Sequence, residues 1–158
     1  MDALVITGPT ASGKSDLSCT LAELLNGEII SADSAQVYKG LDIGTAKPER
    51  IVQDKLKHHL LDIRDPGEIY TVADFRNDSL RIISEIKGRG KVPIISGGTM
   101  LYLKALREGL ADLPAANPSV RENIELDATK HGWEKLHSDL KIIDPMSAER
   151  IKPNDSQR

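Results

Sequence analysis

The strongest constraint on the fold of this chain is an eight-residue motif near its N-terminus. Residues 8–15 read GPTASGKS and match the pattern G-x-x-x-x-G-K-[ST] in full. The apolar run Ala3–Thr7 precedes the motif and is typical of a buried parallel strand. From Lys14 to Leu25 the pattern predicts a helix, since apolar residues recur at three- and four-residue steps: Leu17, Leu21, Leu24 and Leu25. A strand, a glycine-rich loop and a helix in this order predict a phosphate-binding loop in an α/β protein.

Further apolar runs predict the other strands of the sheet, at Glu28–Ala32, Leu60–Ile63 and Val92–Ser96. Before the last of these runs we predict a helix that begins after Thr71, with Asp74 three residues later as in a capping box, and ends at Gly88 and Gly90. Strands that alternate with helices predict a P-loop NTPase-like parallel sheet with helices on both faces. Such a sheet binds ligands at the carboxyl ends of its strands.

The character of the chain changes after Gly109. A Pro/Ala/Asn linker at Leu113–Pro118 is followed by three predicted short helices, at Ser119–Lys130, Gly132–Leu140 and Pro145–Ile151. We therefore expect a P-loop α/β core over residues 1–112 and a helical insertion, or the start of a second lobe, over residues 113–158. The last residues, from Pro153 on, have the pattern of a helix start with no helix after it, so we expect the chain to be a fragment.

Composition excludes several classes of protein. With 21 Lys and Arg against 24 Asp and Glu, the net charge is −3, which is not that of a basic domain that coats nucleic acid. A lone cysteine, Cys19, excludes an internal disulfide and a structural cysteine zinc site. No apolar run reaches the roughly 18 to 20 residues that span a bilayer. We expect a soluble, cytoplasmic monomer that does not associate with membranes.

The motif itself supplies the groups that a phosphate chain needs. Its glycines let successive backbone N–H groups point at phosphate oxygens, Lys14 adds a positive charge, and the Ser15 hydroxyl can bind Mg²⁺. The competing interpretation, a glycine-rich turn that only starts a helix, is disfavoured by the strand and helix on either side. We predict that the whole motif binds a diphosphate or triphosphate: Gly8, Pro9, Thr10, Ala11, Ser12, Gly13, Lys14 and Ser15.

Polar residues also follow the other predicted strands. Asp33 lies at the carboxyl edge of a strand that we expect to neighbour the phosphate loop, where it could hold magnesium, act as a general base or cap a turn. Asp62 and Asp65 could also hold magnesium or belong to a solvated turn. Thr99 could offer its hydroxyl to a phosphate or cap the next helix. We expect Met100 and Leu103 to face the core.

Several segments together resemble the tRNA dimethylallyltransferase family, in order from near residue 4 to Arg158: GPTASGKS, SADSAQVYKGLDIGTAKP, HHLLDIRDP, GGTMLYLKAL and DPMSAERIKPNDSQR. The resemblance implies transfer of a dimethylallyl group from dimethylallyl diphosphate to the N6 amine of the adenosine next to the tRNA anticodon. It implies the tRNA anticodon arm as partner and Mg²⁺ as cofactor. It also implies that the phosphate loop holds the diphosphate of the donor rather than ATP, and that the family's chain continues past Arg158.

The resemblance also implies roles for single residues. Asp33 matches the general base, and Thr99 matches a catalytic residue that bridges diphosphate and substrate. Arg121 matches a basic residue on the substrate side. The other matches are to residues that line the adenine pocket or begin a stretch that contacts tRNA: Ser34, Ala35, Gln36, Gln157 and Arg158.

Other interpretations stay open on sequence grounds. A small-molecule P-loop kinase would share the loop, but it needs an arginine-bearing lid, and Arg107 and Arg121 are the only arginines between the fourth predicted strand and the helical region. An adenylate isopentenyltransferase would act on free AMP or ATP; the segments DIGTAKP and PNDSQR favour tRNA. A non-enzymatic nucleotide-binding module is the third alternative.

Overall fold

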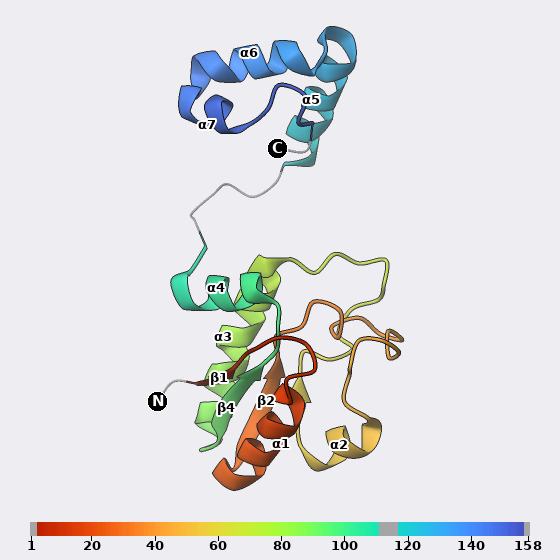
Figure 1. The fold of residues 1–158 in the computed structure, drawn as a ribbon, viewed down its shortest axis with the longest axis vertical. Coiled ribbons are helices and arrows are strands. Elements are labelled where there is room, and N and C mark those ends of the chain that lie inside the picture. Colours follow the sequence, from red (N-terminus) through yellow and green to blue (C-terminus); the bar gives the residue numbers. More distant parts are fainter. Residues whose placement is uncertain (1–2, 111–116, 157–158) are drawn as a thin grey trace. The chain divides into compact units, whose positions relative to one another are not determined.

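The computed structural model describes residues 3–110 and 117–156. It contains two compact units, residues 1–111 and residues 112–158 (Figure 1). The first unit holds β1 (Leu4–Ile6), α1 (Lys14–Leu25), β2 (Gly27–Ser31), α2 (Arg50–Lys55), β3 (His58–His59), α3 (Val72–Gly88), β4 (Val92–Ser96) and α4 (Met100–Glu108). The second unit holds α5 (Pro118–His131), α6 (Trp133–Ile143) and α7 (Pro145–Arg150).

The first unit is built on a four-stranded parallel sheet with the strand order β1-β4-β2-β3. The sequence predicts that the strand before Asp33 neighbours the phosphate loop, and this prediction is wrong in detail, because β4 lies between β1 and β2. The apolar run of β4 suits this central place, since Ile94 and Ile95 are almost fully buried. β1 is an edge strand, and Val5 on it is half exposed.

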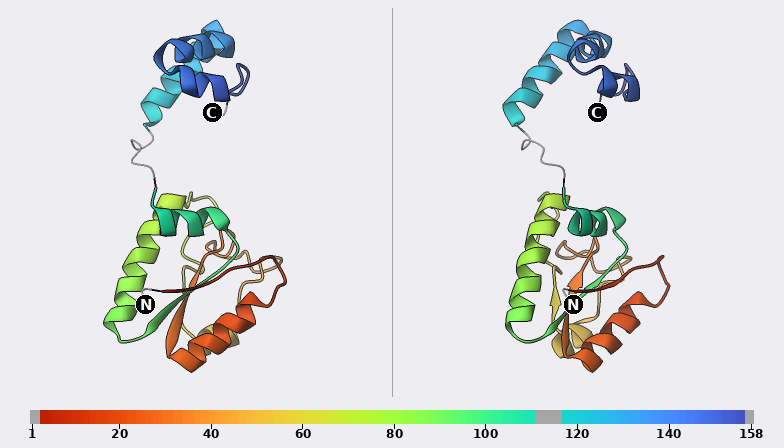
Figure 2. Two further views of the ribbon diagram at one scale, coloured as in Figure 1. Left: turned by 60° about the vertical axis from the view of Figure 1, so that its left-hand side comes forward. Right: turned by 90° about the vertical axis from the view of Figure 1, so that its left-hand side faces the viewer.

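Helices cover both faces of the sheet, as the sequence predicts (Figure 2). On one face, Ile29 and Ile94 pack with Ala22 of α1. On the other face, the neighbouring residues of the same strands pack against α3 and α4, in a cluster that includes Ile30, Ile95, Phe75, Ile86 and Tyr102. Two apolar layers on one parallel sheet confirm the predicted P-loop-like α/β fold.

The two longest helices of this unit, α1 and α3, begin where the sequence predicts. α3 begins after Thr71 as predicted, and the Thr71 and Asp74 side chains form a complete capping box. α1 has the predicted bounds, but of the four leucines on its predicted apolar face only Leu21 packs against the core. Leu24 is 73% exposed, and Leu17 and Leu25 are also exposed. The residues that α1 buries are small, Ser18 and Ala22, so the helix packs closely on the sheet.

Two other predictions for this unit need correction. The third strand is His58–His59 rather than Leu60–Ile63, because Leu60 and Asp62 have left-handed backbone angles (φ 63° and 54°) that end the extended run. Leu60 is nevertheless buried in the core. Met100 is 65% exposed instead of facing the core, whereas Leu103 packs against the core as expected.

The second unit consists of the three helices that the sequence predicts. Asn117 caps α5 by accepting hydrogen bonds from two backbone N–H groups, and Asp144 caps α7 in the same way through one. The His137 ring lies within hydrogen-bond distance of the carbonyl oxygens of Ala148 and Ile151, which ties α6 to α7. Pro118 of the predicted linker is the first residue of α5; residues 113–116 lie outside the described residues.

Candidate phosphate and substrate site

Three loops meet at the carboxyl edge of the sheet. Backbone hydrogen bonds join the ends of β1, β4 and β2: Gly97 N donates to Ile6 O (3.2 Å) and Ala32 N to Ser96 O (2.8 Å). Thr99 N then donates to Ala32 O at 3.1 Å. The chain segments after all three strands are therefore held against one another, with the loop after β4 in the middle.

Two glycines let the central loop come this close to its neighbours. A Cβ atom at Gly97 would lie 2.3 Å from the carbonyl oxygen of Ala32, so only glycine fits there. Gly98 faces the phosphate loop, and a Cβ atom on it would lie 3.8 Å from the carbonyl oxygen of Gly8. The loop Ser96–Thr99 thus touches the Asp33 segment on one side and the phosphate loop on the other.

The phosphate loop has the backbone shape that an anion-binding loop requires. Ala11 and Gly13 adopt left-handed conformations (φ 61° and 79°), and left-handed residues within a turn are typical of loops whose N–H groups bind an anion. The Lys14 side chain folds back over the loop, and its ammonium donates to the carbonyl oxygen of Pro9 at 2.5 Å. The loop ends at the N-terminus of α1, where helix dipole and N–H groups favour a bound anion.

A hydrogen bond between two hydroxyls fixes the loop's helix to the sheet. Ser18 Oγ donates to the carbonyl oxygen of Lys14 at 2.6 Å and is also hydrogen-bonded to Ser96 Oγ at 2.6 Å. Ser18 is almost fully buried, so α1 packs on the sheet through this contact as well as through Leu21 and Ala22. It places the first turn of α1 directly beside the end of β4.

The residues present fit a magnesium ion that keeps much of its water. Ser15 is exposed in the first turn of α1, where its hydroxyl oxygen can serve as one hard ligand beside phosphate oxygens. Within residues 3–110 and 117–156 no group of three or more His, Cys, Asp or Glu side chains could hold a metal. Asp62 and Asp65, the other magnesium candidates, form ion pairs with Lys47 (2.6 Å) and Lys39 (3.2 Å).

Asp33 follows β2 and forms a turn with its own backbone. Its Oδ1 accepts hydrogen bonds from Ala35 N (2.8 Å) and Gln36 N (3.4 Å). The turn-capping role is therefore present, and it uses one carboxylate oxygen. No donor in the described part of the chain reaches Oδ2, and the residue is only half-buried. A carboxylate held by one oxygen with the other free is well placed to accept a proton.

The Thr99 hydroxyl joins the central loop to this turn. It accepts a hydrogen bond from Ser34 N (3.0 Å) and donates to Ser34 Oγ (3.5 Å). Thr99 is the N-cap residue of α4, but its side chain makes no capping hydrogen bond to that helix. The hydroxyl is thus turned toward the Asp33 turn, while the neighbouring Gly98 faces the phosphate loop.

The Gln36 side chain is fully engaged within the protein. Its Oε1 accepts from Ser31 Oγ (2.9 Å), and its Nε2 donates to the carbonyl oxygens of Thr45 (3.0 Å) and Ala46 (3.1 Å). The amide therefore links the end of β2 to the segment that follows, and its donors do not point at an open pocket. Ser34 is exposed and Ala35 half-buried beside it.

The remaining predicted site residues belong to the second unit. Arg121 is exposed on α5, where it lines an open groove of that unit together with Trp133 and Lys152. The structure describes Arg121 only within this unit. Gln157 and Arg158 lie outside the described residues.

Two buried charged residues have no role in the sequence predictions. The side chain of Lys47, in the GTAKP segment, is only 4% exposed. Glu28, on β2, is 2% exposed and pairs with His59 (2.7 Å), Arg89 (2.7 Å) and Lys91 (3.2 Å). Burial alone would raise the pKa of Glu28, but hydrogen bonds from Arg89, His59 and Lys91 outweigh it and lower the pKa to about 2. Sequence offers no signal for either, since burial of a charge depends on partners distant along the chain.

Two residues that could suggest other chemistry, Cys19 and His58, have structural surroundings that explain them. Cys19 packs in the α1 layer, and burial raises the pKa of its thiol, which makes it a poor nucleophile. His58 contacts the carbonyl oxygen of Leu56 at 2.7 Å, and burial lowers the pKa of its imidazole. No helix among the residues described is long and apolar enough to cross a membrane.

Solved structures are similar to this chain over almost its whole length. A tRNA isopentenylpyrophosphate transferase from Bacillus halodurans is 44% identical, with a TM-score of 0.68 over 98% of this chain. A tRNA delta(2)-isopentenylpyrophosphate transferase from Staphylococcus epidermidis is 41% identical, with a TM-score of 0.64 over 97%. A eukaryotic dimethylallyltransferase acting on tRNA is 33% identical, with a TM-score of 0.78 over 97%.

This chain spans 52%, 50% and 38% of those three proteins, respectively. The similarity includes the phosphate loop, because it extends over nearly all of this sequence. A sequence model of the family described as IPP transferase matches residues 36–158, from Gln36 through the helical unit. The family model covers more than half of the chain and the solved relatives are up to 44% identical to it, so the chain belongs to the IPP transferase family.

Proposed function

We propose that this chain forms the donor-binding part of an enzyme that transfers a dimethylallyl group from dimethylallyl diphosphate to tRNA. The acceptor is the N6 amine of the adenosine next to the anticodon. The observation that carries the proposal is the meeting of the phosphate loop, the Asp33 turn and Thr99 at one sheet edge. The names of the solved relatives, all transferases acting on tRNA, support this choice of reaction.

On the donor side, the chain stabilises a departing diphosphate. The N–H groups of the phosphate loop and the Lys14 ammonium bind its oxygens, and the Thr99 hydroxyl, which contacts the Asp33 turn, reaches the diphosphate from the loop after β4. Groups fixed before the reaction stabilise charge that develops on the leaving group without having to reorganise. Magnesium, held by Ser15 and the diphosphate, would neutralise further negative charge when bound.

On the acceptor side, Asp33 removes a proton. The adenine nitrogen forms a bond to the allylic carbon as the bond from that carbon to the diphosphate oxygen breaks, and the diphosphate leaves with the electron pair. The nitrogen becomes positively charged and acidic, so the Asp33 carboxylate can take its proton. Asp33 Oδ2 is the free atom for this step. The adenine must leave the anticodon stack to reach Asp33, as in other enzymes that act on a nucleobase.

The first experiment asks which phosphate ligand stabilises the 158-residue chain. We expect dimethylallyl diphosphate with Mg²⁺ to raise its melting temperature, since a ligand at about 100 times its Kd adds roughly 2.7 kcal/mol to the stability of the folded state. Lys14→Ala should abolish this shift, whereas Lys57→Ala, on an exposed lysine at the opposite end of the sheet, should not. Stabilisation by ATP alone would favour a kinase instead.

The second experiment tests Asp33 as the general base, in a chain as long as the solved relatives. Asp33→Asn cannot accept the proton, so it should lower turnover by about 10²-fold or more at saturating donor and tRNA. Donor affinity should stay unchanged. Asp65→Asn is a matched control, because Asp65 is exposed and its ion-pair partner among the described residues is Lys39. Normal turnover by Asp33→Asn would assign Asp33 to the turn alone, and transfer to free AMP but not tRNA would favour an adenylate isopentenyltransferase.

The location and assembly of the protein complete the proposal. We propose a cytoplasmic monomer, on the basis of the lone cysteine and the mildly acidic composition. Sedimentation of the chain at micromolar concentration tests the monomer directly.

A further inference from the structure

A loop of residues 40–46 leaves the body of the first unit next to the Asp33 turn. Its residues are mostly exposed, and Ile43 at its tip is 98% exposed. Within the loop, Thr45 Oγ1 donates to the carbonyl oxygen of Leu41 at 2.7 Å, which closes it on itself. Ile43 is the most exposed of the large apolar side chains among the described residues, and it lies in a loop next to the proposed site.

The buried Lys47 side chain holds this loop through hydrogen bonds. Its ammonium donates to the Tyr38 carbonyl oxygen (2.9 Å), to Asp42 Oδ1 (2.7 Å) and to Asp62 Oδ1 (2.6 Å). These three acceptors use all three N–H groups of the lysine. Tyr38 precedes the loop, Asp42 belongs to it, and Asp62 lies in the segment after β3, so one side chain ties the loop to itself and to the body of the unit.

The Lys47 ammonium stays charged in this position. Burial would lower its pKa, but the hydrogen bonds and charges of Asp42 and Asp62 outweigh burial and raise the pKa. A buried charge with well-placed partners gives little net stability, yet it fixes one geometry, because every other arrangement leaves the charge unpaired. Lys47 therefore restricts the loop to a single position.

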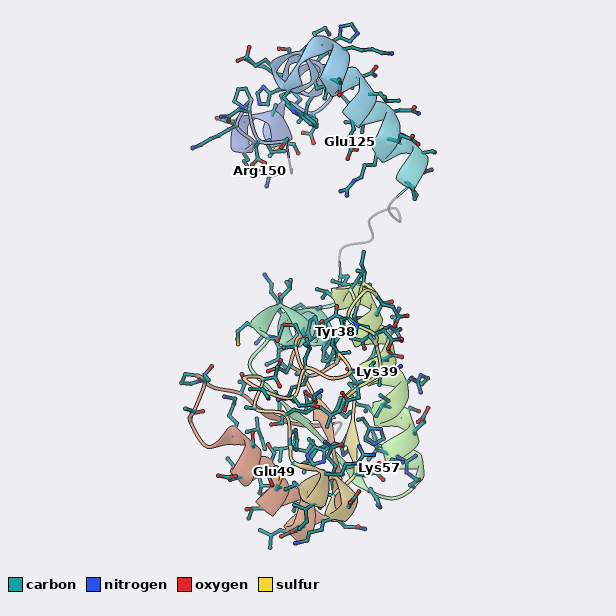
Figure 3. All side chains as sticks on the ribbon, turned by 90° about the vertical axis from the view of Figure 1, so that its right-hand side faces the viewer. Tyr38, Lys39, Glu49, Lys57, Glu125 and Arg150 are labelled. Carbon is teal, nitrogen blue, oxygen red and sulfur yellow. The ribbon has the colours of Figure 1, made fainter. Side chains whose placement is uncertain are left out.

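The anchored loop is connected to the reactive edge of the sheet. Gln36, whose N–H bonds to Asp33, donates its side-chain amide to the carbonyl oxygens of Thr45 and Ala46, directly before Lys47. Figure 3 shows Tyr38, which precedes the loop, at the end of the unit near α4, and Glu49, which follows the loop, at the opposite end near α2. The loop thus starts at the edge where Asp33 and Thr99 lie.

We infer that Lys47 is a positioning residue that holds loop 40–46, with Ile43 at its tip, against the acceptor RNA beside the reacting adenine. This inference rests on the proposed function, which supplies the RNA acceptor. An apolar side chain suits this place, since apolar wedges pack against bases that have been unstacked from their neighbours. The loop contacts the acceptor and not the diphosphate, which binds on the other side of Thr99.

The first test compares two buried ion networks at opposite ends of the sheet. Lys47→Met keeps the volume of the side chain and removes the charge; Glu28→Gln weakens the network at the amino end of β2 and is the matched control. In a chain as long as the relatives, Lys47→Met should raise the KM for tRNA about tenfold, with the KM for dimethylallyl diphosphate unchanged. Glu28→Gln should change neither KM at a temperature where both variants are folded.

A second measurement does not depend on activity. Amide hydrogen exchange in residues 40–46 should be faster in Lys47→Met and unchanged in Glu28→Gln. If Lys47→Met does not fold, Asp62→Asn replaces it, because asparagine tolerates the left-handed backbone at that position. Loop exchange as slow as in the parent, or a tRNA KM that rises equally in Glu28→Gln, would overturn the inference. A parent chain that transfers nothing to tRNA would instead refute the proposed function.

A variant of Ile43, at the tip of the loop, is compared with a control variant at an exposed isoleucine outside the loop. Ile43→Ala should raise the KM for tRNA about fivefold through the loss of apolar contact. Ile51→Ala, on an isoleucine of α2 that is 62% exposed, should leave it unchanged. Equal tRNA KM values for the parent and Ile43→Ala would remove the loop from the acceptor side of the site.

Discussion

Replacing Gly97 with alanine tests whether the contact between the loops after β4 and β2 holds the site together. The added Cβ atom would lie 2.3 Å from the Ala32 carbonyl oxygen, roughly 1 Å closer than an ordinary van der Waals contact. Moving the loop away stretches two hydrogen bonds, Ala32 N to Ser96 O and Thr99 N to Ala32 O. Each is worth about 1 kcal/mol, and overpacking costs about 1 to 3 kcal/mol more. We expect Gly97→Ala to lower stability by about 3 to 5 kcal/mol.

Gly98→Ala is the control for this prediction, because an added Cβ atom there meets only the Gly8 carbonyl oxygen, at 3.8 Å. Its stability should stay within about 0.5 kcal/mol of the parent. Exchange of the slowest amides in β2 and β4 reports the stability of this unit without contributions from the helical unit. The reasoning is refuted if Gly97→Ala exchanges as slowly as the parent, or if Gly98→Ala is destabilised to the same extent.

Two further predictions concern the scaffold. The pKa of Glu28 is about 2 in the folded protein, below its ordinary 4.5, so its contribution of about 3 kcal/mol is present above pH 4.5 and is lost as pH falls toward 2. Urea unfolding between pH 5 and pH 2.5 should show this loss in the parent and a weaker pH dependence in Glu28→Gln. Thr71→Ala should destabilise α3 by about 1 kcal/mol and Thr71→Ser by much less, measured by amide exchange in that helix.

Features that depend on neighbouring residues are predictable from this sequence. The bounds of α1 and β4 and the start of α3 agree with the predictions because glycines, apolar spacing and the Thr71 capping box act within a few residues. The order of the strands is not predictable from such local signals, since β4 takes its place between β1 and β2 only when the sheet assembles. The third strand was misplaced because the left-handed conformation of Leu60 does not show in an apolar run.

The candidate site also has features that the sequence predicts and features that it does not. The motif at residues 8–15 and the position of Asp33 and Thr99 after strands can be read from the sequence, but the hydrogen bond that joins Thr99 to Ser34 links positions 65 residues apart. The alternatives for Thr99 remain equal until the structure shows that its side chain does not cap α4. The burial of Lys47 is likewise invisible, because its partner Asp62 lies 15 residues away in an irregular segment.

The two buried ion networks act at different ends of the first unit. Glu28 joins β2 to β3 and to the residues before β4 at the amino ends of the strands, where no site residue lies. Lys47 holds an exposed loop near the carboxyl ends. The two networks hold different parts of the unit together: the first joins the strands of the scaffold, and the second fixes the position of a contact surface. Changes at Glu28 should therefore appear as altered stability and changes at Lys47 as altered acceptor binding.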